Sequence, residues 1–208
     1  MVVVYSYLFV FGIIGISTFF NKKGIFNDET SRKFIHIGVG NWIIVAYFFF
    51  EDPFWSVFPP FTFIVLNYIS YRYDLFKAME RDHKTKNDLG TVYYAVSLFI
   101  VVLLDFVLFD QVKLSVLPIL VMAYGDGLSA VVGTHFTSKK LYQNKTMYGS
   151  ITMFVVSMVI AGILGYSIIG IVVIGIVETV VEMWSPKGYD NLTVPLILYS
   201  ILLTGLVV

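Results

Sequence analysis

An aspartate between two glycines begins the only stretch of this chain in which an acid, several hydroxyl groups and a cluster of lysines lie close together, residues 122–150. Asp126 stands between Gly125 and Gly127 near the end of an apolar run, and Gly149–Ser150 opens the next run. A carboxylate can hold a divalent cation. Lysines and backbone N–H groups exposed by glycines can cradle phosphates. The combination predicts a site for a metal and a nucleotide at a membrane surface.

Asp126 shares one helical face with Ser129 and Gly133, because positions i, i+3 and i+7 coincide on an α-helix. A carboxylate at the end of a membrane span is costly unless it is solvated, paired or bound to a metal. We therefore predict that Asp126 binds a metal and that Ser129, Gly133 and the flanking glycines shape the nucleotide site. The alternative is a solvated acid beside a glycine that ends a helix.

Three lysines follow this helix, Lys139, Lys140 and Lys145. Phosphates require positive charge and hydrogen-bond donors, and lysine provides both. Lys145 directly precedes Thr146 and the Gly149–Ser150 pair, so we predict that it binds phosphates together with that backbone. Lys139 is a further candidate nucleotide contact. The alternative for Lys139 and Lys140 is anchoring at the cytoplasmic membrane surface.

More acids occur toward the C-terminal end. Glu178 and Glu182 form an i, i+4 pair, which repels itself unless a cation lies beside it. Glu178 lies deeper in its apolar run and is the stronger candidate for a metal ligand or base, whereas Glu182 is expected to be solvated. Asp190 is a candidate metal ligand or base and Asn191 a candidate nucleotide contact. N-capping of the last helix is the alternative for both.

A basic group begins the second apolar run, where Arg32 and Lys33 are followed within one turn by His36. All three are candidate nucleotide contacts. The alternatives are two topology anchors and a core histidine with satisfied hydrogen bonds. Acids outside these groups, such as Asp105, are expected on the opposite membrane face, where water would solvate them.

The composition predicts the elements that hold these groups. The 208 residues are 58% hydrophobic and 13% charged, with a mean hydropathy of +0.82 and no cysteine. Such a composition is typical of a polytopic membrane protein, and apolar runs of about 17–20 residues are long enough to cross a hydrocarbon core of roughly 30 Å. We predict an all-α membrane bundle in one domain, residues 1–208. Without cysteine there is no disulfide and no thiolate chemistry.

The chain divides into eight candidate helices. They are expected at residues 2–20, 32–50, 54–71, 90–108, 113–133, 148–164, 167–184 and 192–206. The division between the sixth and seventh rests on the cluster of Gly162, Gly165 and Ser167, and a bundle of seven spans is the alternative.

Basic residues support the count of eight. Of the 14 lysines and arginines, all except Lys113 fall in or beside the loops on one side. By the positive-inside rule that side is cytoplasmic, so both termini of this integral, multi-pass protein are predicted outside. The candidate residues gather at the same ends of their helices. We therefore expect an active site at the cytoplasmic face.

Six short motifs occur in a fixed order along most of the chain. They are RKFIH at 32–36, GTVYY at 90–94, GDGLSA at 125–130 with Gly133, KTMYGS at 145–150, Glu178, and DNLTVP at 190–195. This order resembles the CTP-dependent lipid alcohol kinases: dolichol kinase, phytol kinase and polyprenol kinases, which are related to the phosphatidate cytidylyltransferases. Ala130 separates the chain from the cytidylyltransferases, which carry a second aspartate at that spacing.

The resemblance implies transfer of the terminal phosphate of CTP to an isoprenoid alcohol, such as a polyprenol, dolichol, phytol or geranylgeraniol. It implies Mg²⁺ held by Asp126, with Glu178 or Asp190 as a second ligand or as the base. Lys145 would bind phosphates, and Arg32 and His36 would steady them. The nucleotide would come from the cytoplasm and the alcohol from among the membrane lipids, its tail entering between helices. No nucleic acid is expected as a partner, and a homo-oligomer is left open.

Two other functions stay open. A CTP-dependent diacylglycerol kinase or a phosphatidate cytidylyltransferase would need a similar site. A non-enzymatic lipid or ion transporter would use Asp126 and Glu178 as an intramembrane ion site. The gathering of acids and lysines at one face, instead of the midplane, favours an enzyme.

Overall fold

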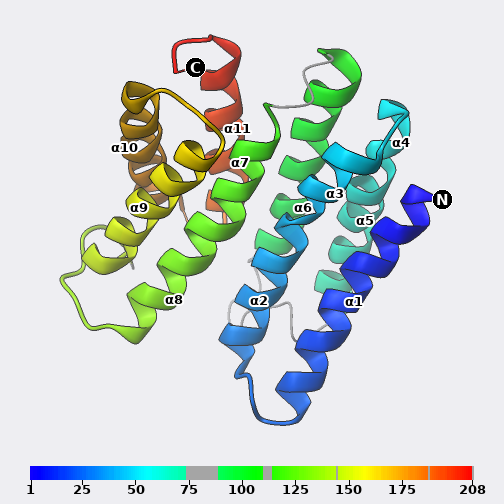
Figure 1. Ribbon diagram of the computed structural model, residues 1–208. Helices are drawn as coiled ribbons and strands as arrows, with labels where there is room; N and C mark the ends of the chain where they lie inside the picture. The colour runs from blue at the N-terminus through cyan, green and yellow to red at the C-terminus, as the bar shows by residue number, and fades with distance from the viewer. Residues whose placement is uncertain (74–88, 110–113, 144, 187, 208) are drawn as a thin grey trace.

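The protein is all-α in this computed structural model, which describes residues 1–73, 89–109, 114–143, 145–186 and 188–207 (Figure 1). Consecutive helical segments run up and down the bundle. Some of them are bent, and two contain π-helical turns, labelled η. In chain order the elements are α1 (Val2–Lys22), α2 (Asp28–Gly40), α3 (Trp42–Phe49), α4 (Pro53–Ser56), α5 (Phe58–Tyr73), α6 (Gly90–Val102), η2 (Leu103–Leu108), α7 (Val116–Leu120), η3 (Val121–Asp126), α8 (Gly127–His135), α9 (Met147–Ile163), α10 (Ile168–Trp184) and α11 (Asp190–Leu203).

Each of the eight expected helices is present, with differences at their ends and with a break at Asn41 within the second. The second begins at Asp28, not near Arg32, because the side chain of Asn27 accepts a hydrogen bond from the backbone N–H of Thr30 at 2.8 Å and caps the helix. The third divides at Val57, just before two prolines, which lack backbone N–H donors. The predicted break between the sixth and seventh helices is confirmed, since α9 ends at Ile163 and α10 begins at Ile168.

Three helices in the described ranges are long and apolar enough to cross a membrane. They are Val2–Lys22, Gly90–Leu108 and Val116–His135, and α9 and α11 are shorter apolar helices. Large apolar side chains point outward from the bundle, including Phe48, Ile168 and Ile169, which are 70%, 82% and 78% exposed. Contact with lipid explains such a surface, and a multi-pass membrane protein is the class it supports. The count of eight spans stays a prediction.

The connections place the two termini at one end of the bundle in Figure 1 and the α1–α2 and α8–α9 loops at the other. These loops carry Lys23, Lys139 and Lys140, in agreement with the predicted clustering of positive charge. The basic residues at 77–86, Lys113 and Lys187 lie outside the described residues. Which end faces the cytoplasm stays a prediction.

The two π-helical turns interrupt the helices that carry buried aspartates. A π turn inserts one extra residue into an α-helix and changes the direction in which the following side chains point. Asp105 lies in η2 and Asp126 ends η3. Asp105 is fully buried, so the expectation that water solvates it is wrong.

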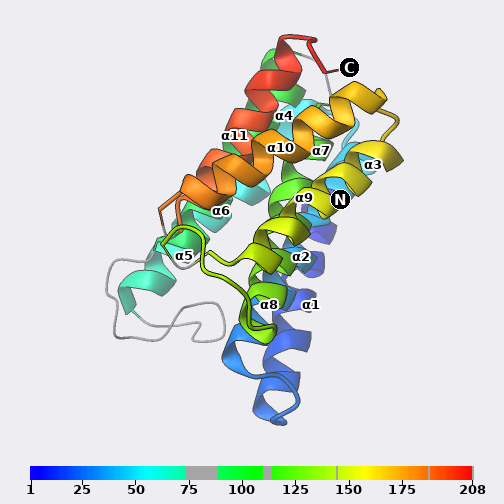
Figure 2. The same cartoon turned by 90° about the vertical axis from the view of Figure 1, so that its left-hand side faces the viewer.

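Helix α9 packs closely on α8 because both present glycines. A Cβ added at Gly133 would lie 2.7 Å from the Thr146 side-chain oxygen and 3.5 Å from the Cα of Gly149. Gly125 is equally tight, since an added Cβ would lie 2.6 Å from the sulfur of Met153. These close approaches hold the N-terminal end of α9, and the loop before it, against the helix that carries Asp126 (Figure 2).

Candidate active site

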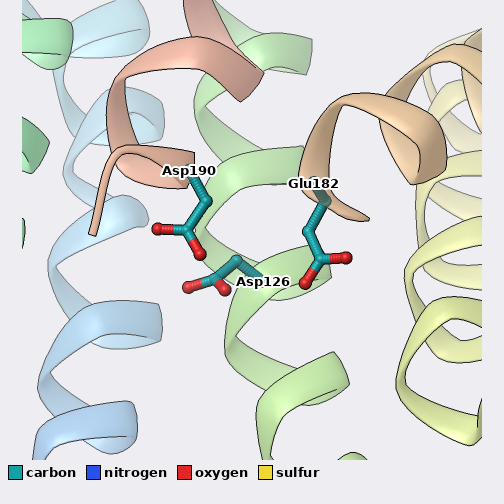
Figure 3. A group of neighbouring side chains, drawn as sticks. All are labelled: Asp126, Glu182 and Asp190. Atoms are coloured by element: carbon teal, nitrogen blue, oxygen red, sulfur yellow. The ribbon is translucent and has the colours of Figure 1, made fainter. Parts of the chain in front are cut away.

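Three buried carboxylates converge from three helices (Figure 3). Asp126 comes from η3, Glu182 from α10 and Asp190 from the start of α11. One oxygen from each lies within 4.8 Å of the others, and the residues are 5%, 2% and 8% exposed. Carboxylates this close repel one another unless cations lie among them.

Two side chains of α2 provide positive charge or hydrogen-bond donors to Asp126. The Lys33 ammonium lies 3.0 Å from Asp126 Oδ2, and His36 Nε2 lies 3.3 Å from the same oxygen. Both reach it because positions i and i+3 share a helical face and α2 packs against η3. The hydroxyl of Tyr94 donates to the His36 backbone carbonyl at 2.9 Å, and Ser129 Oγ donates to that of Asp126 at 3.0 Å.

Lys145 provides the cation for the other two acids. Its ammonium donates to Asp190 Oδ2 at 3.0 Å and also to Glu182. A tight turn aims it there, since Leu141 N–H donates to the Lys145 carbonyl and Lys145 N–H to that of Tyr142, both at 2.9 Å. Burial alone would lower the pKa of Lys145, but the charges of Asp190, Asp126 and Glu182 outweigh it and raise that pKa above its ordinary range.

The donor set fits a divalent cation. Three carboxylates supply the hard oxygen ligands that Mg²⁺ and Mn²⁺ prefer. Glu182 Oε2 is buried and has no hydrogen-bond partner among the described residues, which leaves one ligand atom unused. The buried acidic triad could therefore bind a metal, through Asp126, Glu182 and Asp190.

The triad contains Glu182 where sequence reasoning had preferred Glu178. The expectation that Glu182 is solvated is wrong, because its residue is 2% exposed and its carboxylate is paired with Lys145. Glu178 lies one turn deeper, is fully buried, and neither of its oxygens has a partner in the part of the chain described. The only sequence signal for Glu182 was its place in the i, i+4 pair, which does not show which member faces the other acids.

The candidate phosphate loop is arranged differently from the expectation. Thr146 caps α9 by accepting from the Gly149 N–H at 3.3 Å, and its carbonyl accepts from the Ser150 N–H at 2.9 Å. These two amides are already used within the loop in this structure. The side-chain hydroxyl of Ser150 is buried and has no partner among the residues described. Lys139 and Lys140 are exposed, unlike Lys145, which is consistent with their alternative role as anchors.

The start of α11 also differs from the N-cap interpretation. Asp190 and Asn191 are the first two residues of the helix, and the cap position is Tyr189, with no side-chain cap. Asn191 Nδ2 donates to the Gly90 carbonyl at 2.9 Å, which ties α11 to α6. Arg32 pairs with Glu29 through Nη2, and its buried Nε has no partner in the described ranges.

A pocket connects this polar cluster with an apolar interior. At its polar end lie Arg32, Lys33, His36, Asp126, Asp190 and Asn191. Elsewhere its walls are mainly apolar side chains of α1, α2, α3, α5 and α6, including Val10, Ile14, Trp42, Phe63 and Leu98, together with Asn67 and Thr91. Gly127 lies at the contact between α8 and α2, where an added Cβ would be 2.6 Å from Ile37. The arrangement suits a ligand with one polar end and a long apolar body.

Comparison with known proteins agrees with this chemistry. The chain is 30% identical over 189 residues to a phytol kinase of Synechocystis sp., covering 85% of this chain and 79% of the relative. It is 27% identical over 147 residues to phytol kinase 1, chloroplastic, of Arabidopsis thaliana and spans 47% of that protein. An uncharacterized protein of Methanocaldococcus jannaschii is 27% identical over 137 residues.

No family model matches the chain, and no solved structure matches it. The Synechocystis relative combines 30% identity with coverage of most of both chains. This chain belongs to the phytol kinase family.

Proposed function

We propose that this protein is a membrane kinase that transfers the terminal phosphate of a nucleotide, expected to be CTP, to the hydroxyl of an isoprenoid alcohol. The observation that carries the proposal is the pocket whose apolar walls end at Lys33 and at Asp126 and Asp190, two of the three acids of the triad. A kinase for a soluble alcohol would need no such walls. Membership of the phytol kinase family supports the same reaction class.

In the transfer, the alcohol oxygen forms a bond to the terminal phosphorus, and the bond from phosphorus to the leaving nucleoside diphosphate breaks. The hydroxyl proton must pass to a base. Of the two acids that the sequence offered as the base, Asp190 and Glu178, we choose Asp190 because it lines the pocket, whereas Glu178 does not. Such reactions depend on positioning and charge neutralisation more than on covalent chemistry.

Lys33, Lys145 and Arg32 are the cations that we assign to the phosphates. Lys33 and Lys145 now pair with Asp126, Glu182 and Asp190, and the unpartnered Nε of Arg32 is a free donor within the described residues. A divalent metal bound by the triad would neutralise charge that develops on the phosphate oxygens. His36 holds Asp126 in place from α2.

The test is a substrate panel with the purified protein in lipid nanodiscs. The γ-labelled nucleotides CTP, ATP, GTP and UTP are each combined with phytol, geranylgeraniol, dolichol or diacylglycerol in the presence of Mg²⁺. We expect label in an isoprenyl monophosphate, with release of the nucleoside diphosphate. Label in phosphatidic acid would identify a diacylglycerol kinase. Formation of a CDP-lipid from phosphatidate and CTP would identify a cytidylyltransferase, and no transfer with any pair would overturn the proposal.

Orientation and span number are part of the same proposal. We propose eight spans with both termini outside and the triad near the cytoplasmic face, so that CTP reaches it from the cytoplasm. Cysteines introduced at positions 23, 52 and 139 test this in sealed vesicles. Labelling of position 52 alone by an impermeant reagent from outside is expected, and labelling of 23 and 139 from outside would contradict it.

A further inference from the structure

The side-chain oxygen of Asn191 is a buried hydrogen-bond acceptor to which no described residue donates. Asn191 is 9% exposed, and its Oδ1 has no hydrogen-bond partner in the described part of the chain. A buried polar atom without a partner is costly, and in a pocket a ligand can supply that partner.

The orientation of the Asn191 amide follows from its other contact. The Gly90 carbonyl, 2.9 Å from the amide nitrogen, can only accept a hydrogen bond, so the NH₂ group must face it. Oδ1 is then the atom left for the pocket, which Asn191 lines together with Gly90, Thr91 and Asp190. Asn191 directly follows Asp190 in the chain and therefore lies next to the triad.

The chemistry of this oxygen excludes a phosphate as its ligand. An ionised phosphate has acceptor oxygens only, so it would repel Oδ1. The unpartnered Nε of Arg32 in the same pocket is a donor, which suits phosphate, whereas Asn191 Oδ1 suits a hydrogen-bond donor or a cation. An alcohol hydroxyl is such a donor, and the apolar walls beyond Asn191 suit the chain attached to it.

We propose that Asn191 binds the acceptor alcohol before transfer, with its Oδ1 accepting the hydrogen bond of the substrate hydroxyl, whose proton then turns to the neighbouring Asp190 as the bond to phosphorus forms. The inference rests on the proposed function and assigns Asn191 to the alcohol, not to the nucleotide as its sequence context suggested. It makes Asn191 a specificity residue for a free hydroxyl at the end of an apolar chain. The Gly90 contact fixes the amide in the orientation that this requires.

A hydroxyl and its methyl ether separate this role from a structural one. Binding of geranylgeraniol and of geranylgeranyl methyl ether, which lacks the proton, is measured by competition against tritiated geranylgeraniol in nanodiscs without nucleotide. Wild type should prefer the alcohol by about tenfold, the size of one well-made hydrogen bond. Asn191→Ala should reduce the preference to near one, and Asn191→Ser, which keeps an oxygen acceptor, should retain part of it.

Asn67→Ala is the matched control. Asn67 lines the same pocket and donates through Nδ2 to the Thr91 carbonyl at 2.9 Å, so it ties another helix to α6. This variant should keep the preference for the alcohol, which separates loss of the hydroxyl contact from loosening of the bundle. A preference retained in Asn191→Ala, or absent from wild type, would overturn the inference.

Kinetics distinguish the remaining assignments. Asn191→Ala should raise KM for the alcohol about tenfold and leave KM for the nucleotide unchanged. A rise confined to KM for the nucleotide, or to the metal concentration required, would place Oδ1 in the nucleotide or metal site and refute the proposal. Discrimination between alcohol and ether without any phosphate transfer would instead refute the proposed function and keep the alcohol subsite.

Discussion

The π-helical turns η2 and η3 each carry a buried aspartate, but the two aspartates have different partners. Asp105 in η2 accepts from the Ser115 N–H at 2.8 Å and from the Tyr199 hydroxyl at 3.4 Å, both neutral donors. Asp126 in η3 meets Lys33, His36 and two other carboxylates. Asp105 joins η2 to the start of the next helix and to α11, whereas Asp126 lines the pocket.

The difference shows that burial of an acid does not by itself identify a functional site. Neutral donors that come from the protein satisfy each oxygen of Asp105 with one hydrogen bond. At the triad, one carboxylate oxygen has no partner among the described residues, and the ammonium groups of Lys33 and Lys145 are available to pair with substrate phosphates. Such clusters of mutually perturbing charges are typical of active sites. We expect variants of the triad to change the rate of phosphate transfer and variants of Asp105 to change the free energy of unfolding.

The largest expected effect is that of Asp126→Asn. Removing this charge from the triad should lower the initial rate of phosphate transfer by about a hundredfold or more, because the lost contact would act on charge that develops in the transition state. Thermal unfolding in detergent should show a folded protein. A rate near that of wild type would show that Asp126, like Asp105, has a structural role and takes no part in catalysis.

Glu182→Gln should have the next largest effect. Its carboxylate is part of the triad, so the rate should fall by about ten- to a hundredfold and the Mg²⁺ concentration needed for half-maximal rate should rise. Glu178→Gln, one turn away on the same helix, is the matched control and should change both values little. A larger effect of Glu178→Gln than of Glu182→Gln would show that Glu178 is the functional acid of the pair, as the sequence had predicted.

Lys145→Gln should weaken nucleotide use by about tenfold, seen as a higher KM for CTP, because its ammonium would no longer share its charge with the phosphates. The double variant Lys139→Gln/Lys140→Gln, in the same loop but exposed, should stay close to wild type. Lys145→Arg should restore activity only in part. If the double variant fails while Lys145→Gln behaves normally, the phosphates bind elsewhere in the loop.

The charge of Lys145 should not vary across the working pH range. Its folded pKa is raised above the ordinary value of about 10.4, so its contribution is complete below that pH and is lost only as the pH rises through the folded pKa. Rate profiles of wild type and Lys145→Arg between about pH 6 and pH 9 should therefore have the same shape. An inflection present only in wild type would contradict this.

The smallest effect on catalysis is expected for Asp105→Ala. The variant leaves the Ser115 N–H and the Tyr199 hydroxyl without their acceptor, which should cost about 1–3 kcal/mol of unfolding free energy. Tyr199→Phe, which removes one donor only, should cost less. The rate per folded molecule should be unchanged in both. A large loss of rate at full stability would show that the two regions are coupled.

The sequence by itself determined the helices and the types of residue in the site. Apolar runs and the glycine–serine cluster near 162–167 define the helical segments, because helix length and hydrophobic burial are encoded locally. Asp126 could be named as a candidate because a charge at the end of an apolar run is costly. Lys145, Asp190 and Lys33 could be named because they lie in the ordered motifs that resemble the lipid alcohol kinases. The start of α2 was missed by several residues, although Asn27 is a recognisable cap.

Only the tertiary structure decided which charges meet. The choice between Glu178 and Glu182 depends on which turn of α10 lies level with η3 and α11, and the sequence of α10 carries no information about that level. The π turns change the direction of Asp105 and Asp126 without any distinctive sequence. Whether a donor such as the Gly149 N–H is free depends on its neighbours in space, here Thr146. Pairing is set by packing between helices, so partners distant in sequence become visible only in the folded bundle.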